Sequence, residues 1–233
     1  MDNFSIIIPI FNEGKNIEKL LIEIYENLYN FNNFEVIVVN DGSTDDTKLI
    51  LKKLKDKHQI NIIDLNKNYG QSFAIREGVL KAKNNIIITI DGDGQNNPAD
   101  IKKLLLFFIN EKIFSLVGGI RIKRKDSLIK IFSSKIANFI RNLILKDECP
   151  DTGCSLKVFD KNIFLSFPFF DGMHRFLPAL FKGFGKKNHF IYVDHRSREF
   201  GISKYDTFRR GIRGIRDLIK VVKIIKKFKR NNG

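Results

Sequence analysis

The chain has 233 residues, 43% of them hydrophobic, which is enough for one large domain with a buried core. Its 41 basic and 26 acidic residues give a formal net charge of +15, which predicts an anionic partner: nucleic acid, a phosphate-bearing substrate or an acidic membrane surface. Two cysteines exclude a disulfide-stapled scaffold and a four-cysteine zinc site. Because no stretch of about 18 apolar residues and no leader-like pattern is present, we expect a soluble protein of the reducing cytoplasm.

Short apolar runs alternate with longer amphipathic stretches over the first 120 residues. The runs predict strands at 4–8, 34–39, 60–64, 86–90 and 115–119, and the stretches predict helices at 16–30, 44–57, 71–83 and 98–111. The run 86–90 is almost all Ile, which is typical of a strand covered on both faces. Ser43 or Thr44 is the expected cap of the second helix. This order predicts an α/β fold with a doubly wound, mostly parallel sheet and helices on both faces.

Polar clusters follow four of the expected strands, at 9–13, 40–45, 66–70 and 91–95. One such loop is ordinary turn chemistry, but four at one edge of a sheet indicate a site, because ligands of these sheets bind at the carboxyl ends of the strands. The loops match neither the Walker pattern nor a dinucleotide-binding pattern.

The loop 91–95 carries two carboxylates two residues apart, Asp91 and Asp93, on a turn that contains glycines. These carboxylates can converge with the Gln95 amide on one hard cation, Mg²⁺ or Mn²⁺, which completes its shell with diphosphate oxygens and water. Such an ion neutralises charge on a departing nucleoside diphosphate. The pattern also forms turns, so taken alone it leaves both readings open. The twelve-position ligand pattern of an EF-hand is absent.

Five motifs in order give the chain a clear resemblance. They are Ile6-Ile7-Ile8-Pro9-Ile10-Phe11-Asn12-Glu13, Val38 to Thr47, Asn68-Tyr69-Gly70-Gln71, Asp91 to Gln95, and Arg198 to Tyr205. With these motifs the chain resembles family 2 glycosyltransferases of the GT-A fold, within the subgroup of dolichol-phosphate mannose synthases and other polyprenyl-phosphate glycosyltransferases. The resemblance covers residues 5 to about 205. It implies inverting transfer of a sugar from a nucleotide donor.

The resemblance also implies residue roles. Four residues would line the nucleotide-base pocket: Pro9, Phe11, Glu13 and Asp41. Asp41 would accept a hydrogen bond from a base N–H, and Asp91 would serve both nucleotide and metal. The metal motif is matched by Asp91, Asp93 and Gln95.

Basic residues would meet phosphate groups. Arg121 matches an arginine that contacts phosphate, and Lys135 stands where the subgroup has a second basic residue. The motif that closes on the diphosphate or on the acceptor phosphate supplies Arg198, Ser203 and Lys204. For each lone Arg or Lys, a solvated surface charge is the alternative.

The acceptor decides whether a base is required. A lipid phosphate is already ionised and needs no strong base, whereas a hydroxyl requires a carboxylate. Asp151 lies where many family 2 enzymes place acceptor-side acids, although an Asp before Gly also forms turns. Cys149 and Cys154 flank this loop and are expected to be buried thiols, since the four histidines show no ligand spacing. His174 is expected to cap or pack rather than to bind substrate.

The positive charge is concentrated at the end of the chain. Residues 208–233 carry ten basic side chains against one acid, Asp217, which gives +9. From Thr207 apolar residues recur at three- and four-residue steps beside a basic face: Ile212, Ile215, Ile219, Val222 and Ile225. A basic amphipathic helix is typical of elements that lie on anionic membranes. The alternative is a helix that packs its apolar stripe on the domain.

The sequence therefore predicts a GT-A domain over 1–206 and a basic amphipathic helical tail over 207–233. We expect a metal-dependent glycosyltransferase that moves a GDP- or UDP-linked sugar to a polyprenyl-phosphate or similar lipid-linked acceptor, peripheral on the cytoplasmic face of the cell membrane. The alternative is a family 2 enzyme acting on a hydroxyl of a saccharide or lipid A-type precursor.

A nucleic-acid-binding protein is disfavoured because the tail has only two aromatic residues on which bases could stack and the expected pocket is acidic. A nucleotidyltransferase is disfavoured because a Gly-rich phosphate loop followed by Lys is missing near the N-terminus.

Overall fold

The strands form one mixed sheet of seven in the computed structural model, which describes residues 3–31, 33–122, 139–198 and 207–232. The strand order across the sheet is β3-β2-β1-β4-β6-β5-β7. The bounds are β1 Phe4–Ile10, β2 Phe34–Asn40, β3 Ile60–Asp64, β4 Ile86–Thr89, β5 Leu116–Arg121, β6 Lys157–Asp160 and β7 Asn188–Val193. All neighbours are parallel except β6, which is antiparallel to both β4 and β5.

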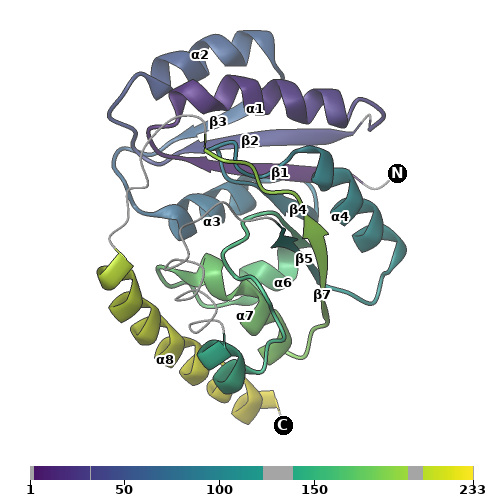
Figure 1. Cartoon of the computed structure of the whole chain (residues 1–233), viewed down its shortest axis with the longest axis vertical. Coiled ribbons are helices and arrows are strands. Elements are labelled where there is room, and N and C mark those ends of the chain that lie inside the picture. Colours follow the sequence, from purple (N-terminus) through teal and green to yellow (C-terminus); the bar gives the residue numbers. More distant parts are fainter. Residues whose placement is uncertain (1–2, 32, 123–138, 199–206, 233) are drawn as a thin grey trace.

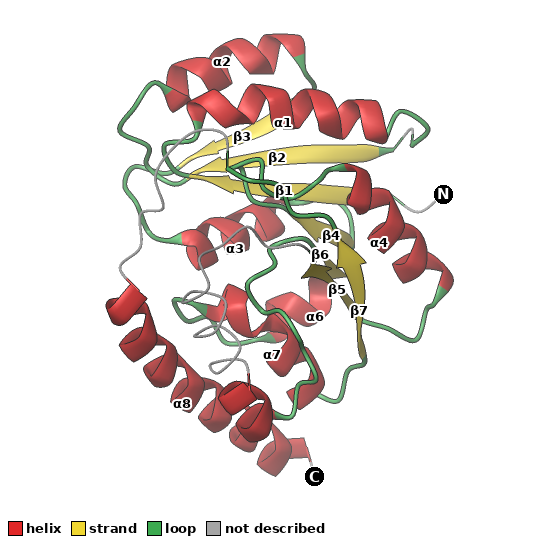
Figure 2. Ribbon diagram, viewed as in Figure 1, coloured by secondary structure: helices red, strands yellow, loops and turns green. Residues whose placement is uncertain are grey.

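Helices cover both faces of this sheet (Figures 1 and 2). One face is covered by α1 (Gly14–Asn27), α2 (Thr47–Lys57) and α4 (Ala99–Asn110). The other is covered by α3 (Gln71–Lys81), α6 (Lys161–Ser166), the 3₁₀ turn η1 (Met173–Phe176), α7 (Leu177–Gly183) and α8 (Thr207–Asn232). Residues 139–145 form a further helical segment. The expected mostly parallel sheet with helices on both faces is confirmed.

The apolar pattern of the strands explains these two layers. In β1, Ile6 and Ile8 point into the core under α1 and α4, whereas Ile7 points into the core under α3. In β4, Ile88 points into the core under α1 and α4, and Ile87 points into the core under α3. The near-continuous Ile run was therefore correctly interpreted as a strand buried on both faces.

Two expectations need correction. Strand β6 was not predicted, and it inserts between β4 and β5, so the fifth expected strand does not pair with the fourth. Helix α2 begins at Thr47 rather than at residue 44, because the side chains expected to cap it bind elsewhere. Ser43 Oγ accepts a hydrogen bond from the Asn12 N–H (2.9 Å), and Thr44 binds the Asn12 side chain.

The last helix, α8, packs on the α/β unit along part of its length (Figure 1). Val221 is fully buried, Phe228 stacks on Phe184 with ring centroids 3.9 Å apart, and the buried Asp217 pairs with Arg175 at 2.7 Å. Ile215, by contrast, is 63% exposed. The packing stripe is thus rotated from the expected one. The expected boundary between the GT-A domain and the tail, between residues 206 and 207, stays a prediction.

Within the described residues, no helix combines the length and the apolar character that crossing a bilayer requires.

Candidate active site

The loops after β1, β2 and β4 meet at one edge of the sheet, as the sequence predicts. Asn12, which has a positive φ of 56°, joins the first two loops. Its side-chain oxygen accepts from the Thr44 N–H (2.8 Å), and the Asp41 N–H donates to the carbonyl of Ile10 (2.8 Å). These contacts fix the two loops against each other, so that their side chains have defined positions.

Two glycines permit close approach of the loops. A Cβ on Gly92 would lie 2.3 Å from a methyl group of Ile10. Gly42 has a φ of +67°, and a Cβ there would lie 2.2 Å from the backbone of Lys67. Larger residues at either position would push the loops apart, because neither neighbour is a flexible chain end.

Asp41, expected to bind the nucleotide base, is held by the loop after β3. Its carboxylate accepts from the backbone N–H groups of Tyr69 (2.8 Å) and Gly70 (2.9 Å). Burial raises the pKa of Asp41, while these two hydrogen bonds oppose the rise. Asp41 therefore links the loops after β2 and β3 at the expected pocket; its contact with a base stays a prediction.

Asp91 lies between α3 and the loop that precedes β6. Its Oδ1 accepts from Gln71 Nε2 (2.7 Å), and its N–H donates to Ser155 Oγ (3.2 Å). Burial and then repulsion from the neighbouring Asp93 raise the pKa of Asp91 above its usual range. Sequence reasoning missed Gln71 as a contact, although it lies in one of the matched motifs.

Asp93 faces a cation of the chain itself. Arg198 Nη2 lies 2.7 Å from Asp93 Oδ2 and 3.4 Å from Glu13 Oε1. Burial lowers the pKa of Arg198, but the hydrogen bond and charge of Asp93 outweigh burial and raise it. The backbone N–H of Gln95 donates to Asp93 Oδ1 (3.1 Å), and this hydrogen bond closes the turn. The structure thus brings together Asp93, Glu13, Gln95 and Arg198, four of the predicted site residues.

The residues at this turn fit a divalent cation. Two carboxylates two residues apart in the sequence, Asp91 and Asp93, would supply hard oxygen ligands, and Gln95 would supply a further amide oxygen. Burial, and then the charge of Asp93, raises the pKa of Asp91, and a bound cation would oppose both effects by favouring the ionised carboxylate. Among the described residues, no group of three or more His, Cys, Asp or Glu side chains converges.

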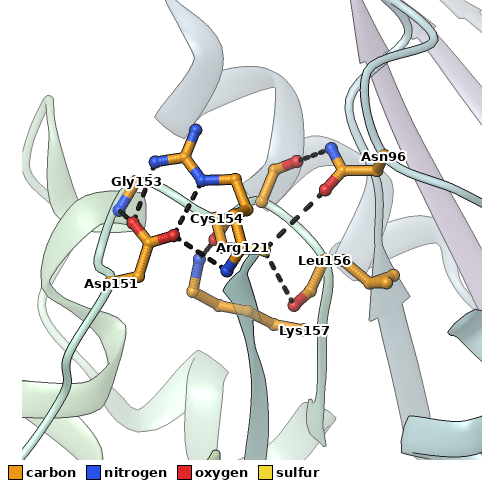
Figure 3. A network of polar contacts seen from close by, with 8 residues as sticks. Asn96, Arg121, Asp151, Gly153, Cys154, Leu156 and Lys157 are labelled. Carbon is orange, nitrogen blue, oxygen red and sulfur yellow. Dashed lines mark hydrogen bonds and ion pairs between the residues drawn. The ribbon is translucent and has the colours of Figure 1, made fainter. Parts of the chain in front are cut away.

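Arg121 and Asp151 form a tight pair at the neighbouring part of the edge (Figure 3). Arg121 Nε donates to Asp151 Oδ2 (2.7 Å) and Nη2 donates to Oδ1 (2.8 Å), with both side chains largely buried. Asp151 also accepts from the Gly153 N–H (3.2 Å). Both carboxylate oxygens are therefore engaged, which suits a residue that orients Arg121 rather than a base.

Sequence reasoning missed Lys157, a buried lysine that contacts Cys154 in the network around Arg121 and Asp151 (Figure 3). It is 4% exposed, its Nζ donates to the carbonyl of Cys154, and its charge lowers the pKa of Asp91. Nothing in the sequence marks this lysine, because it sits in the unpredicted strand β6.

His174 packs as expected. Its Nδ1 lies 2.6 Å from the Oγ of Ser72, a buried side chain near the start of α3. The backbone N–H of His174 donates to the same oxygen. Three predicted residues, Lys135, Ser203 and Lys204, lie outside the described residues. Pro9 is buried in β1, and Phe11 is half-buried just after it.

The two cysteines are expected to resist alkylation in the native protein. Both are buried and unpaired, and burial raises the pKa of Cys149 to about 12 and that of Cys154 to about 11. Since the thiolate is the reactive form, iodoacetamide at about pH 8 should label native protein about a thousandfold more slowly than unfolded protein. Mass spectrometry of timed samples measures this, with urea-unfolded chain as the control. Rapid labelling of one thiol in the folded protein would contradict the burial.

Curated relatives at about one-third identity match most of this chain. It is 34% identical over 211 residues to dodecaprenyl-phosphate galacturonate synthase of Rhizobium johnstonii, covering 88% of this chain and 62% of the relative. It is 33% identical over 208 residues to undecaprenyl-phosphate 4-deoxy-4-formamido-L-arabinose transferase of Pseudomonas savastanoi, covering 88% and 61%. The chain thus spans less than two-thirds of the length of these relatives.

Solved structures agree on the fold. Glucosyl-3-phosphoglycerate synthase from Mycobacterium tuberculosis, in complex with Mn²⁺, UDP and glucosyl-3-phosphoglycerate, superposes with a TM-score of 0.72 at 16% identity, covering 95% of this chain and 78% of that one. The expected GT-A fold is thereby confirmed. A sequence profile described as Glycosyl transferase family 2 matches residues 5–166. The chain therefore belongs to glycosyl transferase family 2.

Proposed function

We propose that the chain is the catalytic part of a metal-dependent, inverting glycosyltransferase that moves a sugar from a UDP- or GDP-linked donor to a polyprenyl phosphate. The observation that carries this proposal is the placement of two carboxylates, Asp91 and Asp93, at one sheet edge with cationic groups: Arg198 pairs with Asp93, and the charges of Lys157 and Arg121 lower the pKa of Asp91. The names of the two relatives support this acceptor class, since each name contains a polyprenyl phosphate.

Each group has a definite task in this proposal. Asp91, Asp93 and Gln95 hold Mg²⁺ or Mn²⁺, which supplies positive charge to the departing diphosphate. Arg198, which lies beside Asp93, adds a guanidinium to the same diphosphate. Glu13 and Asp41 fix the walls of the base pocket. Holding donor and acceptor in line supplies much of the remaining rate enhancement.

The pairing of Asp151 favours a lipid phosphate over a hydroxyl as the acceptor. A hydroxyl acceptor requires a base, and Asp151 is the acid expected near the acceptor. Its two oxygens instead bind Arg121, which is then oriented as a phosphate contact. An ionised phosphate oxygen attacks without a base, so this arrangement matches a phosphate acceptor.

A donor and acceptor screen tests the proposed function. UDP- and GDP-linked sugars are incubated with undecaprenyl phosphate, with Mn²⁺ or Mg²⁺ and with excess EDTA, and lipid-linked sugar is measured after extraction. We expect transfer to the lipid phosphate with one nucleotide class and its loss in EDTA. Transfer only to free saccharides or to dephosphorylated lipid would overturn the acceptor assignment, and turnover in EDTA would overturn the metal assignment.

We further propose that the protein binds the cytoplasmic face of the cell membrane through the helical segment 139–145 and α8. The segment exposes Phe139 (70%) and Leu143 (69%), and α8 exposes Ile215 and Ile219 beside basic side chains. Apolar side chains next to lysines and arginines match an anionic lipid surface. A membrane-bound enzyme would meet its lipid phosphate acceptor at this surface.

Removing two lysines of α8 is expected to weaken vesicle binding. Lys223 and Lys226 are exposed, and each basic residue near an anionic surface contributes about 1 kcal/mol, so Lys223→Gln/Lys226→Gln should bind about thirtyfold more weakly. Co-sedimentation with vesicles of phosphatidylglycerol and phosphatidylcholine measures this. The matched control is Lys52→Gln/Lys53→Gln on α2, and an equal loss in that variant would contradict a specific role of α8.

A further inference from the structure

A short segment after β7 contacts the loop of the expected metal site. In this segment, residues 194–198, which we call the strap, the Arg196 N–H donates to the carbonyl of Gln95 (2.8 Å). An isolated antiparallel bridge joins the strap to the loop next to this contact. The strap and the loop therefore run against each other in a fixed register.

Arg196 fastens the strap with its side chain. Its Nη1 lies 2.6 Å from Glu23 Oε2 on α1, and its Nη2 donates to Asn97 Oδ1 (2.8 Å). One guanidinium thus joins the strap, the helix that follows β1 and the end of the metal-site loop. Neither composition nor the matched motifs marks Arg196, since it precedes the last motif by two residues.

Arg198 projects from the same strap toward the carboxylates. The backbone contact of Arg196 with Gln95 and its side-chain contacts with Glu23 and Asn97 fix the strap two residues before Arg198. The Arg198 guanidinium contacts Asp93 at 2.7 Å and Glu13 at 3.4 Å, and the Asp93 side chain is 13% exposed. A positive charge of the chain therefore lies at the carboxylate that would bind the metal.

Building on the proposed function, we propose that Arg198 is an internal counter-ion of Asp93, which a divalent cation displaces, and that Arg196 is the positioning residue that holds Arg198 there. A guanidinium and a metal ion compete for the same carboxylate oxygen, so the intact strap lowers the affinity for metal alone. Once displaced, Arg198 stays next to the site because Arg196 holds the strap. The displaced charge then lies beside the donor diphosphate, which couples metal binding to donor binding.

Binding of Mn²⁺ without nucleotide tests the counter-ion. The full chain is titrated with Mn²⁺, and free Mn²⁺ is measured by electron paramagnetic resonance. We expect Arg198→Gln to bind Mn²⁺ about tenfold more tightly than the wild type, and Arg198→Lys, which keeps the charge, to bind within about threefold of it. The charge-matched control Lys52→Gln should not change the affinity. Unchanged or weaker binding by Arg198→Gln would overturn the counter-ion role.

A double-mutant cycle tests the positioning role. Arg196→Gln should raise Mn²⁺ affinity about threefold in the wild-type background and have no effect in the Arg198→Gln background, because it acts through Arg198. Effects that multiply in the double variant would overturn the positioning role. If Arg196→Gln does not fold, as judged by circular dichroism, Glu23→Gln removes the same ion pair with a smaller change.

The outcome separates this proposal from the proposed function. If the variants show the expected Mn²⁺ affinities but no sugar is transferred, the counter-ion role of Arg198 is supported and the proposed function is overturned. If metal-dependent transfer to undecaprenyl phosphate occurs but the Mn²⁺ affinities of the variants are unchanged, the proposed function is supported and the counter-ion role is overturned.

Discussion

Asp93→Asn is expected to reduce sugar transfer by about a thousandfold while the protein stays folded. The substitution keeps the shape of the side chain but removes the charge that holds the cation and that pairs with Arg198 at 2.7 Å. Losing it leaves the departing diphosphate without its main source of positive charge. Initial rates at saturating donor measure the effect, and a thermal unfolding curve confirms the fold.

Asp56→Asn is the matched control for this substitution. Asp56 is an exposed aspartate on α2, and its replacement should leave the rate unchanged. If Asp93→Asn retains transfer within about threefold of the wild type, the carboxylate pair does not hold the metal, and the assignment of this turn is wrong.

Asp151→Asn is expected to lower the free energy of unfolding by about 3 kcal/mol. Its carboxylate binds Arg121 through two hydrogen bonds, and both side chains are largely buried, so the substitution leaves a buried guanidinium without its counter-charge. Urea unfolding followed by circular dichroism measures the change.

The control is the surface pair between Lys57 and Glu18, whose side chains are 65% and 49% exposed. Glu18→Gln should change the free energy of unfolding by less than about 0.5 kcal/mol. Equal effects of the two substitutions would show that the Arg121–Asp151 pair contributes no more than a surface contact.

The parallel half of the fold could be predicted because each of its strands is a local apolar run followed by an amphipathic helix. Strand β3 has the expected bounds, and α3 begins at the expected residue. Strand β6 was missed because its four residues, Lys157–Asp160, carry a charge at each end and too little periodicity. Its place between β4 and β5 depends on long-range pairing, which no local pattern encodes.

The site could be predicted where its residues share a motif, as Asp91 and Asp93 do. Contacts between segments that are distant in sequence could not be predicted in the same way. Arg196 contacts Glu23 across 173 positions, and the charge of Lys157 acts on Asp91 only because β6 enters the sheet next to β4. Asp151 was expected near the acceptor, but its pairing with Arg121 could not be predicted. The contact joins the end of β5 to the loop after residue 145, and no local pattern encodes it.

The central claim is that the loop 91–95 binds a divalent cation together with the donor diphosphate. Crystals of the full chain grown with Mn²⁺ and UDP or GDP, measured at the manganese edge, test it most directly. The account predicts an anomalous peak within bonding distance of Asp91 and Asp93, with diphosphate oxygens in its shell and Arg198 moved from Asp93 to the diphosphate. A nucleotide bound elsewhere, with this loop free of manganese, would contradict the account.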